Sequence, residues 1–135
     1  LAINVTAPFL LSRALLPALD GGQIINICST ASLRGGAYVS AYTASKHALL
    51  GLTRALALEL KGIRVDAVCP GFVDSPLTKR SIAQIVEKTG RSTDEARDAL
   101  AEENPRRRLI QPKEVAEAVL DLVRTQGTGR EIVLD

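Results

Sequence analysis

The sequence predicts an α/β fold in which a three-stranded parallel sheet carries helices on both faces. Short apolar runs rich in β-branched residues are typical of buried strands. These runs lie at residues 24–28, 63–69 and 131–134. Segments with helical patterning separate them, at residues 1–19, 41–60, 76–104 and 112–124. Strands that alternate with helices are joined by right-handed crossovers, which makes the sheet parallel.

The first helical segment, residues 1–19, is apolar on nearly every side. Such a helix is expected to be buried or to lie in a subunit interface. Pro8 falls inside it and has no N–H, so the carbonyl of Asn4 should lose its helical partner. Asp20, Gly21 and Gly22 then end the helix before the first strand.

The later elements have recognisable boundaries. Ser40 is a suitable N-cap for the helix over 41–60, and Pro70 closes the second strand. Residues 76–104 are more polar and predict two short helices, with a capping box from Ser92 to Glu95 in the second. This segment is expected to be a mobile lid over a substrate. Pro112 begins the last helix.

Composition excludes several classes of function. The chain has 135 residues, enough for one domain at most, with a formal net charge of only +2 and 3% aromatic residues. These values argue against nucleic-acid binding, and no apolar run is long enough for a membrane span. Cys28 and Cys69 are far apart in sequence, which favours a reduced, intracellular protein. With His47 as the single histidine, we expect no metal site.

The most informative local pattern is Tyr42 followed four residues later by Lys46. Residues four apart on a helix share one face, about 5–6 Å between Cβ atoms. A lysine ammonium favours the phenolate and lowers the pKa of a neighbouring tyrosine, which otherwise titrates near pH ~10. The pair is therefore a candidate acid/base unit for chemistry near neutral pH.

Tyr42 and Lys46 do not stand alone. Ser29 lies 13 positions before Tyr42, and the loop Pro70-Gly71-Phe72-Val73-Asp74-Ser75 follows the second strand. Together with Asn4, the segment from Arg108 to Ala116 and the closing strand from Gly129 to Asp135, these motifs resemble the carboxyl-terminal half of a short-chain dehydrogenase/reductase. Asp66 stands where asparagine is common in that family, and none of the departures removes a catalytic group.

The resemblance covers residues 1–135 and implies the last three strands of a Rossmann-type, doubly wound parallel sheet. We interpret the chain as the carboxyl-terminal part of one Rossmann-like domain. The glycine-rich dinucleotide loop of the family belongs to the preceding half, which is absent from the sequence. The chain alone is accordingly expected to be inactive.

The resemblance implies an NAD(P)-dependent oxidoreductase that transfers hydride between a nicotinamide and a carbonyl or alcohol. Tyr42 would donate the proton, and Ser29 would hydrogen-bond the same substrate oxygen. Lys46 would act on Tyr42 and bind the nicotinamide ribose. Asn4 would hold, through its main-chain carbonyl, a water that links the lysine to solvent.

The family resemblance also implies where the cofactor, NAD or NADP, would be held. Besides Tyr42 and Lys46, its contacts would come from the loop after the second strand. These are Pro70, Gly71, Val73 and Ser75.

The region from Cys69 to Ala116 is most similar to bacterial β-ketoacyl and polyketide ketoreductases, and also to 3-hydroxybutyrate dehydrogenases. The latter bind a carboxylate with a histidine and a lysine at the positions of Ala31 and Val39, which favours a thioester or neutral ketone here. The run 106–108, three arginines, is either a phosphate contact for a carrier or a solvated loop. The alternative enzymes are hydroxy-acid, sugar-alcohol or steroid dehydrogenases.

A competitor from another class is a non-catalytic nucleotide-sensing protein with the same fold. The intact set of Ser29, Tyr42 and Lys46 argues against it. Family members commonly form homodimers or homotetramers through helices that match residues 1–19 and 41–60. We expect a cytoplasmic protein with a small-molecule substrate.

Overall fold

The computed structural model describes all 135 residues. Its element order alternates helices and strands as the sequence predicts. The strands are β1 (Gln23–Ile27), β2 (Arg64–Pro70) and β3 (Glu131–Leu134). The helices are α1 (Ala7–Leu15), α2 (Ser40–Glu59), α3 (Pro76–Thr89), α4 (Thr93–Glu102) and α5 (Pro112–Arg124).

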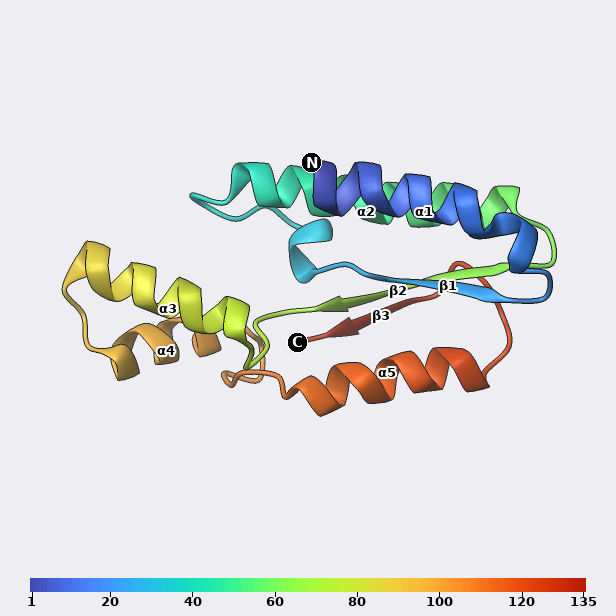
Figure 1. Cartoon of the computed structure of the whole chain (residues 1–135). Helices are drawn as coiled ribbons and strands as arrows, with labels where there is room; N and C mark the ends of the chain where they lie inside the picture. The colour runs from blue at the N-terminus through green and yellow to red at the C-terminus, as the bar shows by residue number, and fades with distance from the viewer.

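The three strands form one parallel sheet in the order β1-β2-β3. Helices α1 and α2 cover one face of this sheet and α5 covers the other (Figure 1). Each crossover between neighbouring strands therefore runs through a helix, which parallel strands require because a tight turn cannot join them. The predicted α/β architecture with a three-stranded parallel sheet is confirmed.

The central strand β2 is the most deeply buried element. Val65, Ala67, Val68 and Cys69 have no exposed surface, because this strand has a neighbour on each side and helices on each face. Its side chains alternate between two clusters. One cluster packs against α2 and contains Cys28, Leu49, Leu50, Ala67 and Cys69, and the other joins Val68 to Ala118 and Leu122 of α5.

Replacing Leu122 with alanine should lower the free energy of unfolding by about 2–5 kcal/mol. Leu122 is 1% exposed, and its loss would leave a cavity between α5 and Val68. Leu120→Ala on the same helix is the matched control, because Leu120 is 47% exposed and should cost far less. Equal losses for the two variants in denaturant unfolding would contradict this account of the core.

The structure corrects the expectation for residues 1–19. They do not form one continuous α-helix: residues Ala2–Thr6 form a π-helical turn, in which the Ala7 N–H bonds to the carbonyl of Ala2, and a short 3₁₀ turn follows α1. Pro8 lies in the first turn of α1, where its missing N–H costs no helical hydrogen bond. The helix is irregular in the turn before the proline, and the loss of a partner for the Asn4 carbonyl stays a prediction.

The expectation that residues 1–19 are buried is also wrong within this chain. The apolar side chains are largely exposed, with Ile3 at 83% and Leu11 at 60%. The contact with α2 is made by the turn Ala2–Thr6, and a helix that is apolar on nearly every side keeps its other faces exposed when only one is covered. The alternative, a subunit interface, stays a prediction.

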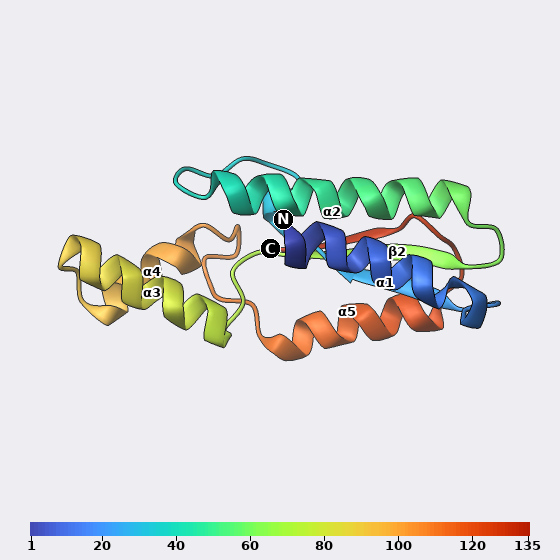
Figure 2. The same cartoon turned by 45° about the horizontal axis from the view of Figure 1, so that its top comes forward.

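Helices α3 and α4 lie beyond the carboxyl ends of the strands, outside the layers formed by α1, α2 and α5 (Figure 2). Their boundaries agree with the sequence, including the reciprocal capping of α4 by Ser92 and Glu95. Ser40, by contrast, is the first helical residue of α2 and not its N-cap, since the helix begins one residue earlier than predicted. None of the helices is both long and apolar enough to cross a membrane.

Candidate active site

Ser29 lies just past the carboxyl end of β1 and is 8% exposed. Its Oγ accepts a hydrogen bond of 3.1 Å from the Ala31 N–H, and its own N–H donates to Ser32 Oγ. These two bonds form a capping box that begins a short 3₁₀ turn. Because Oγ acts here as an acceptor, its hydroxyl proton stays free to be donated to a bound group.

Tyr42 and Lys46 lie one turn apart on α2, as their spacing predicts. The ammonium Nζ of Lys46 is 5.9 Å from the centroid of the Tyr42 ring. The same Nζ donates a hydrogen bond of 2.9 Å to the carbonyl of Ile27, two residues before Ser29. Partial burial lowers the pKa of Lys46. Lys46 therefore connects the Tyr42 helix to the end of the strand that leads into Ser29.

Asn4, in the turn before α1, contacts the same helix α2. Its Nδ2 donates to Ser45 Oγ at 3.1 Å, and Ser45 Oγ donates to the main-chain carbonyl of Tyr42 at 2.7 Å. Asn4 was singled out for its main-chain carbonyl, and the structure adds this side-chain contact. Ser45 was missed, although a small polar residue on the face of Tyr42 was a visible signal.

The loop after β2 is held by hydrogen bonds from several directions. The Gly71 N–H donates to the Leu134 carbonyl at 2.7 Å, and both main-chain groups of Phe72 are bonded to Asn104 or Ile110. The N–H and C=O of Val73 make no hydrogen bond within the chain. Asn104 was missed because nothing in the local sequence distinguishes a buried asparagine from one in a solvated turn.

This unpaired donor and acceptor at Val73 fit a nicotinamide carboxamide, which offers one acceptor oxygen and an NH₂ donor. Lys46 supplies a partly buried ammonium that can bind ribose hydroxyls. The residues present therefore fit the cofactor that the sequence implies. Ser75 has a structural role as well, because its Oγ accepts the Thr78 N–H at 3.4 Å as the N-cap of α3.

The arginine run at 106–108 is engaged in ion pairs. Arg107 bonds to Glu102 at 2.6 Å, and Arg108 makes two bonds of 2.7 Å to Glu114. The hydrogen bond from Arg108, with that from the Gln111 N–H, lowers the pKa of Glu114 to about 2. These contacts favour the solvated-loop interpretation for Arg107 and Arg108 over a phosphate contact.

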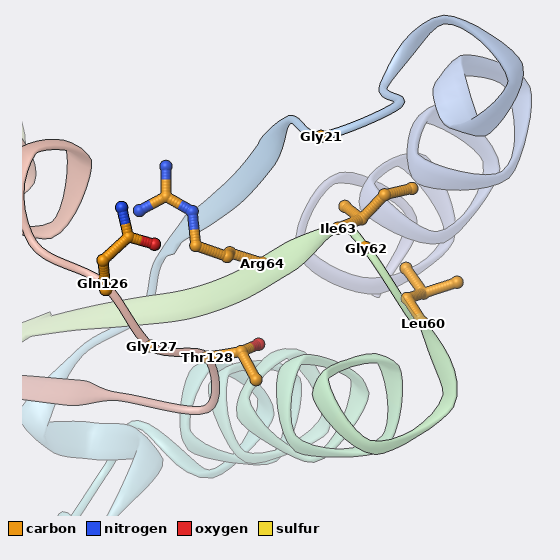
Figure 3. A pocket seen from close by; sticks show the side chains of 8 residues that line it. All are labelled: Gly21, Leu60, Gly62, Ile63, Arg64, Gln126, Gly127 and Thr128. Carbon is orange, nitrogen blue, oxygen red and sulfur yellow. The ribbon is translucent and has the colours of Figure 1, made fainter.

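A hollow of about 360 Å³ lies at the other end of the sheet. Figure 3 shows Arg64 and Gln126 among the loops that line it. Arg64 donates to the carbonyl of Thr125 at 2.7 Å, so it caps the carboxyl end of α5. Parallel α/β sheets bind ligands at the carboxyl ends of their strands. The candidate site is therefore the cluster around Ser29, not this hollow.

Comparisons with known proteins agree with this geometry. The sequence profile described as short chain dehydrogenase matches residues 1–85. A Streptomyces coelicolor protein provisionally named a ketoacyl reductase is 39% identical over 127 residues, which cover 89% of this chain and 49% of that protein. The D-beta-hydroxybutyrate dehydrogenase of Cupriavidus necator is 36% identical over 121 residues, 85% of this chain and 47% of the relative.

Solved structures give the same result. A short chain dehydrogenase family protein from Francisella tularensis superposes with a TM-score of 0.92 at 34% identity, over 98% of this chain and 57% of that one. An actinorhodin polyketide ketoreductase crystallised with NADPH superposes with a TM-score of 0.84 at 34% identity, over 96% and 54%. The chain spans about half the length of the curated relatives it matches. Both comparisons and the matched profile lead to one conclusion: the chain belongs to the short chain dehydrogenase family.

Proposed function

We propose that the protein is an NAD(P)-dependent oxidoreductase that reduces a β-ketoacyl-type carbonyl, a ketoreductase. The observation that carries this proposal is the position of Lys46, which lies beside the Tyr42 ring and bonds to the carbonyl two residues before Ser29. This bond brings the Tyr42 helix to the carboxyl end of β1, where Ser29 follows. Ser29, Tyr42 and Lys46 are the three groups suited to proton transfer and oxygen binding. A sensor or scaffold would not need all three.

In the proposed reaction the reduced nicotinamide, when bound, supplies the hydride to the substrate carbon. Tyr42 donates its phenolic proton to the carbonyl oxygen as negative charge develops there. The free hydroxyl proton of Ser29 forms a hydrogen bond to the same oxygen and stabilises that charge. In the reverse direction Tyr42 takes the proton back from the alcohol.

Lys46 has two roles in this proposal. Its ammonium stabilises the phenolate that remains on Tyr42 after the proton has left. The same group binds the ribose next to the nicotinamide. The bond from Asn4 to Ser45, and from Ser45 to the Tyr42 carbonyl, holds Asn4 against this helix, where its carbonyl can hold a water that resupplies protons.

We assign cofactor contacts to Tyr42, Lys46 and the loop after β2. In that loop Val73 would bind the carboxamide through its main-chain N–H and C=O. Pro70, Gly71 and Ser75 would shape the surface around it. Either NAD or NADP is compatible with these contacts, since none of them reaches the adenosine ribose.

The substrate class follows from the loops around Ser29. Ala31 and Val39 provide no cation for a free carboxylate, although the Cupriavidus relative is named a D-beta-hydroxybutyrate dehydrogenase. A short free hydroxy acid would therefore lack a counter-ion at these positions. A thioester carries the β-keto group without that charge, and this favours it as substrate.

The test compares three substrates in the complete protein that contains residues 1–135. Oxidation of NADH and NADPH would be followed spectroscopically with an acetoacetyl thioester, a bulky aromatic ketone and free acetoacetate. We expect the thioester to have the highest kcat/KM. A higher kcat/KM for free acetoacetate would overturn the ketoreductase assignment in favour of a hydroxy-acid dehydrogenase.

We also propose that residues 1–135 act as part of a longer catalytic domain, because the chain spans about half of its relatives. Residues 1–135 alone should then show no measurable reductase activity. The exposed apolar side chains of α1 support a homodimer or homotetramer in which a second subunit covers them. The buried, unpaired thiols of Cys28 and Cys69 support a cytoplasmic location.

A further inference from the structure

Asn104 is a buried polar residue in the turn after α4, next to the loop that follows β2. It is 2% exposed, among the most deeply buried polar side chains of the chain. We propose that Asn104 is a positioning residue that orients the main chain of Val73 for the nicotinamide carboxamide. This inference rests on the function proposed above.

The side-chain amide of Asn104 pairs with both main-chain groups of one residue. Its Oδ1 accepts the Phe72 N–H at 2.9 Å, and its Nδ2 donates to the Phe72 carbonyl at 3.0 Å. A third bond, 2.7 Å from Nδ2 to the Arg108 carbonyl, joins this pairing to the segment after α4. The amide thus makes bonds with both of its polar atoms, as a buried group requires.

The pairing determines the direction of the Val73 N–H. The Phe72 carbonyl and the Val73 N–H belong to one planar trans peptide, so they point in opposite directions. Because the Phe72 carbonyl points at Asn104, the Val73 N–H must point away from Asn104. That N–H makes no hydrogen bond within the chain. Asn104 therefore holds this unpaired donor on the side of the loop opposite to its own buried side chain.

Gly71 is part of the same arrangement. A Cβ at Gly71 would lie 2.2 Å from Oδ1 and 3.2 Å from Cγ of Asn104. The backbone angles of Gly71 are not in the left-handed region. The glycine is therefore required because the Asn104 amide lies against it. The family resemblance instead placed Gly71 among the cofactor contacts.

The loop retains other supports when Asn104 is changed. Ile110 donates to the Phe72 carbonyl at 2.9 Å and accepts the Asp74 N–H at 2.8 Å. An Asn104→Ala variant should therefore fold with a loosened Val73. Its defect should appear in binding of the nicotinamide and not in binding of the rest of the cofactor.

The experiment measures cofactor binding by calorimetry in the complete protein. Asn104→Ala should bind NADH or NADPH about tenfold more weakly, the loss of roughly one pair of hydrogen bonds. Its affinity for ADP-ribose, or for the phosphorylated form if the protein prefers NADP, should be unchanged, because these ligands lack the nicotinamide. Equal weakening of both ligands, or no weakening, would overturn the inference.

Two further variants separate positioning from loss of stability. Leu122→Ala is destabilised far from this loop and should keep the wild-type ratio of the two affinities. Gly71→Ala should weaken dinucleotide binding by about tenfold alone but by less than about twofold in the Asn104→Ala background, since the clashing amide is then gone. Additive effects of the two substitutions would contradict the proposed contact.

The outcome for the wild-type protein distinguishes the two proposals. A wild-type protein that binds neither NADH nor NADPH would refute the oxidoreductase function. The other outcome is a wild-type protein that binds and turns over the cofactor. If Asn104→Ala then has the wild-type ratio of dinucleotide affinity to ADP-ribose affinity, only the role of Asn104 is refuted.

Discussion

Replacing Tyr42 with phenylalanine is expected to lower kcat/KM of the complete protein by about 10²–10⁴-fold, the usual contribution of a positioned general acid. The phenyl ring keeps the packing of the phenol but has no proton to donate. Lys46 would remain bonded to the Ile27 carbonyl, so the helix should keep its position. Steady-state rates with the best thioester or ketone substrate measure the effect, and cofactor affinity should change little.

The chain contains its own matched control. Its other tyrosine, Tyr38, has a fully exposed side chain and forms no hydrogen bond through its hydroxyl group. Tyr38→Phe should leave kcat/KM unchanged. If Tyr42→Phe retained most of the wild-type rate, Tyr42 would not be the proton donor. If the wild-type protein showed no turnover and Tyr42→Phe kept the wild-type biological effect, the nucleotide-sensing alternative would be favoured.

Replacing Arg130 with methionine should lower the free energy of unfolding by about 3–5 kcal/mol, because it leaves a buried charge without its partner. That charge is Asp66, which has no exposed surface in the centre of the sheet. Arg130 reaches Asp66 through its main-chain N–H at 2.8 Å and its side-chain Nη2 at 3.0 Å. Gln23 adds a bond of 2.6 Å. Denaturant unfolding of the complete protein measures the loss.

Arg54→Met is the matched control for this variant. Arg54 forms a similar two-bond pair with Glu131, but its side chain is 57% exposed. An exposed pair contributes only about 0–1 kcal/mol, so this substitution should be nearly neutral. A comparable loss for Arg54→Met and Arg130→Met would show that burial of Asp66 is not the cause.

The difference between wild type and Arg130→Met should also depend on pH. Burial alone raises the pKa of Asp66, but the hydrogen bonds from Arg130 and Gln23 outweigh it and hold this pKa below its ordinary value. The stabilisation is therefore present above the unfolded pKa and is lost as pH falls through the folded one. In Arg130→Met the Asp66 carboxylate loses the guanidinium bonds that offset its burial. Its pKa is therefore higher than in the wild type, and it takes up a proton at higher pH. The difference in unfolding free energy should shrink from pH ~7 toward pH ~4.

Sequence reasoning located the strands and most helix ends because their signals are local. The β-branched runs of β1 and β2, the capping box of α4 and the proline that begins α5 each depend on residues within one or two turns. The placement of Lys46 beside Tyr42 also followed, since residues four apart share a helix face. The structure adds the bond from Lys46 to the Ile27 carbonyl, two residues before Ser29.

The features that were missed depend on contacts between distant residues. Asn4 meets Ser45 across 41 positions, and Asn104 meets Phe72 across 32. The pairing of Asp66 with Arg130 spans 64 positions. It explains why an aspartate can occupy a position where the family commonly has asparagine. Local periodicity carries no information on such pairings, which form only when the chain has folded.

The sequence by itself determined the fold class and the order of elements, because periodicity and capping residues are properties of neighbouring positions. The candidate reaction came from the resemblance of its motifs to the short-chain dehydrogenase/reductase family. Only the tertiary structure decided which polar groups are buried with partners and which main-chain groups stay free. Burial is a property of the packed layers, and the free energy of a buried polar group depends on the partner that packing places beside it. The unpaired Val73 and the exposed face of α1 are consequences of that packing.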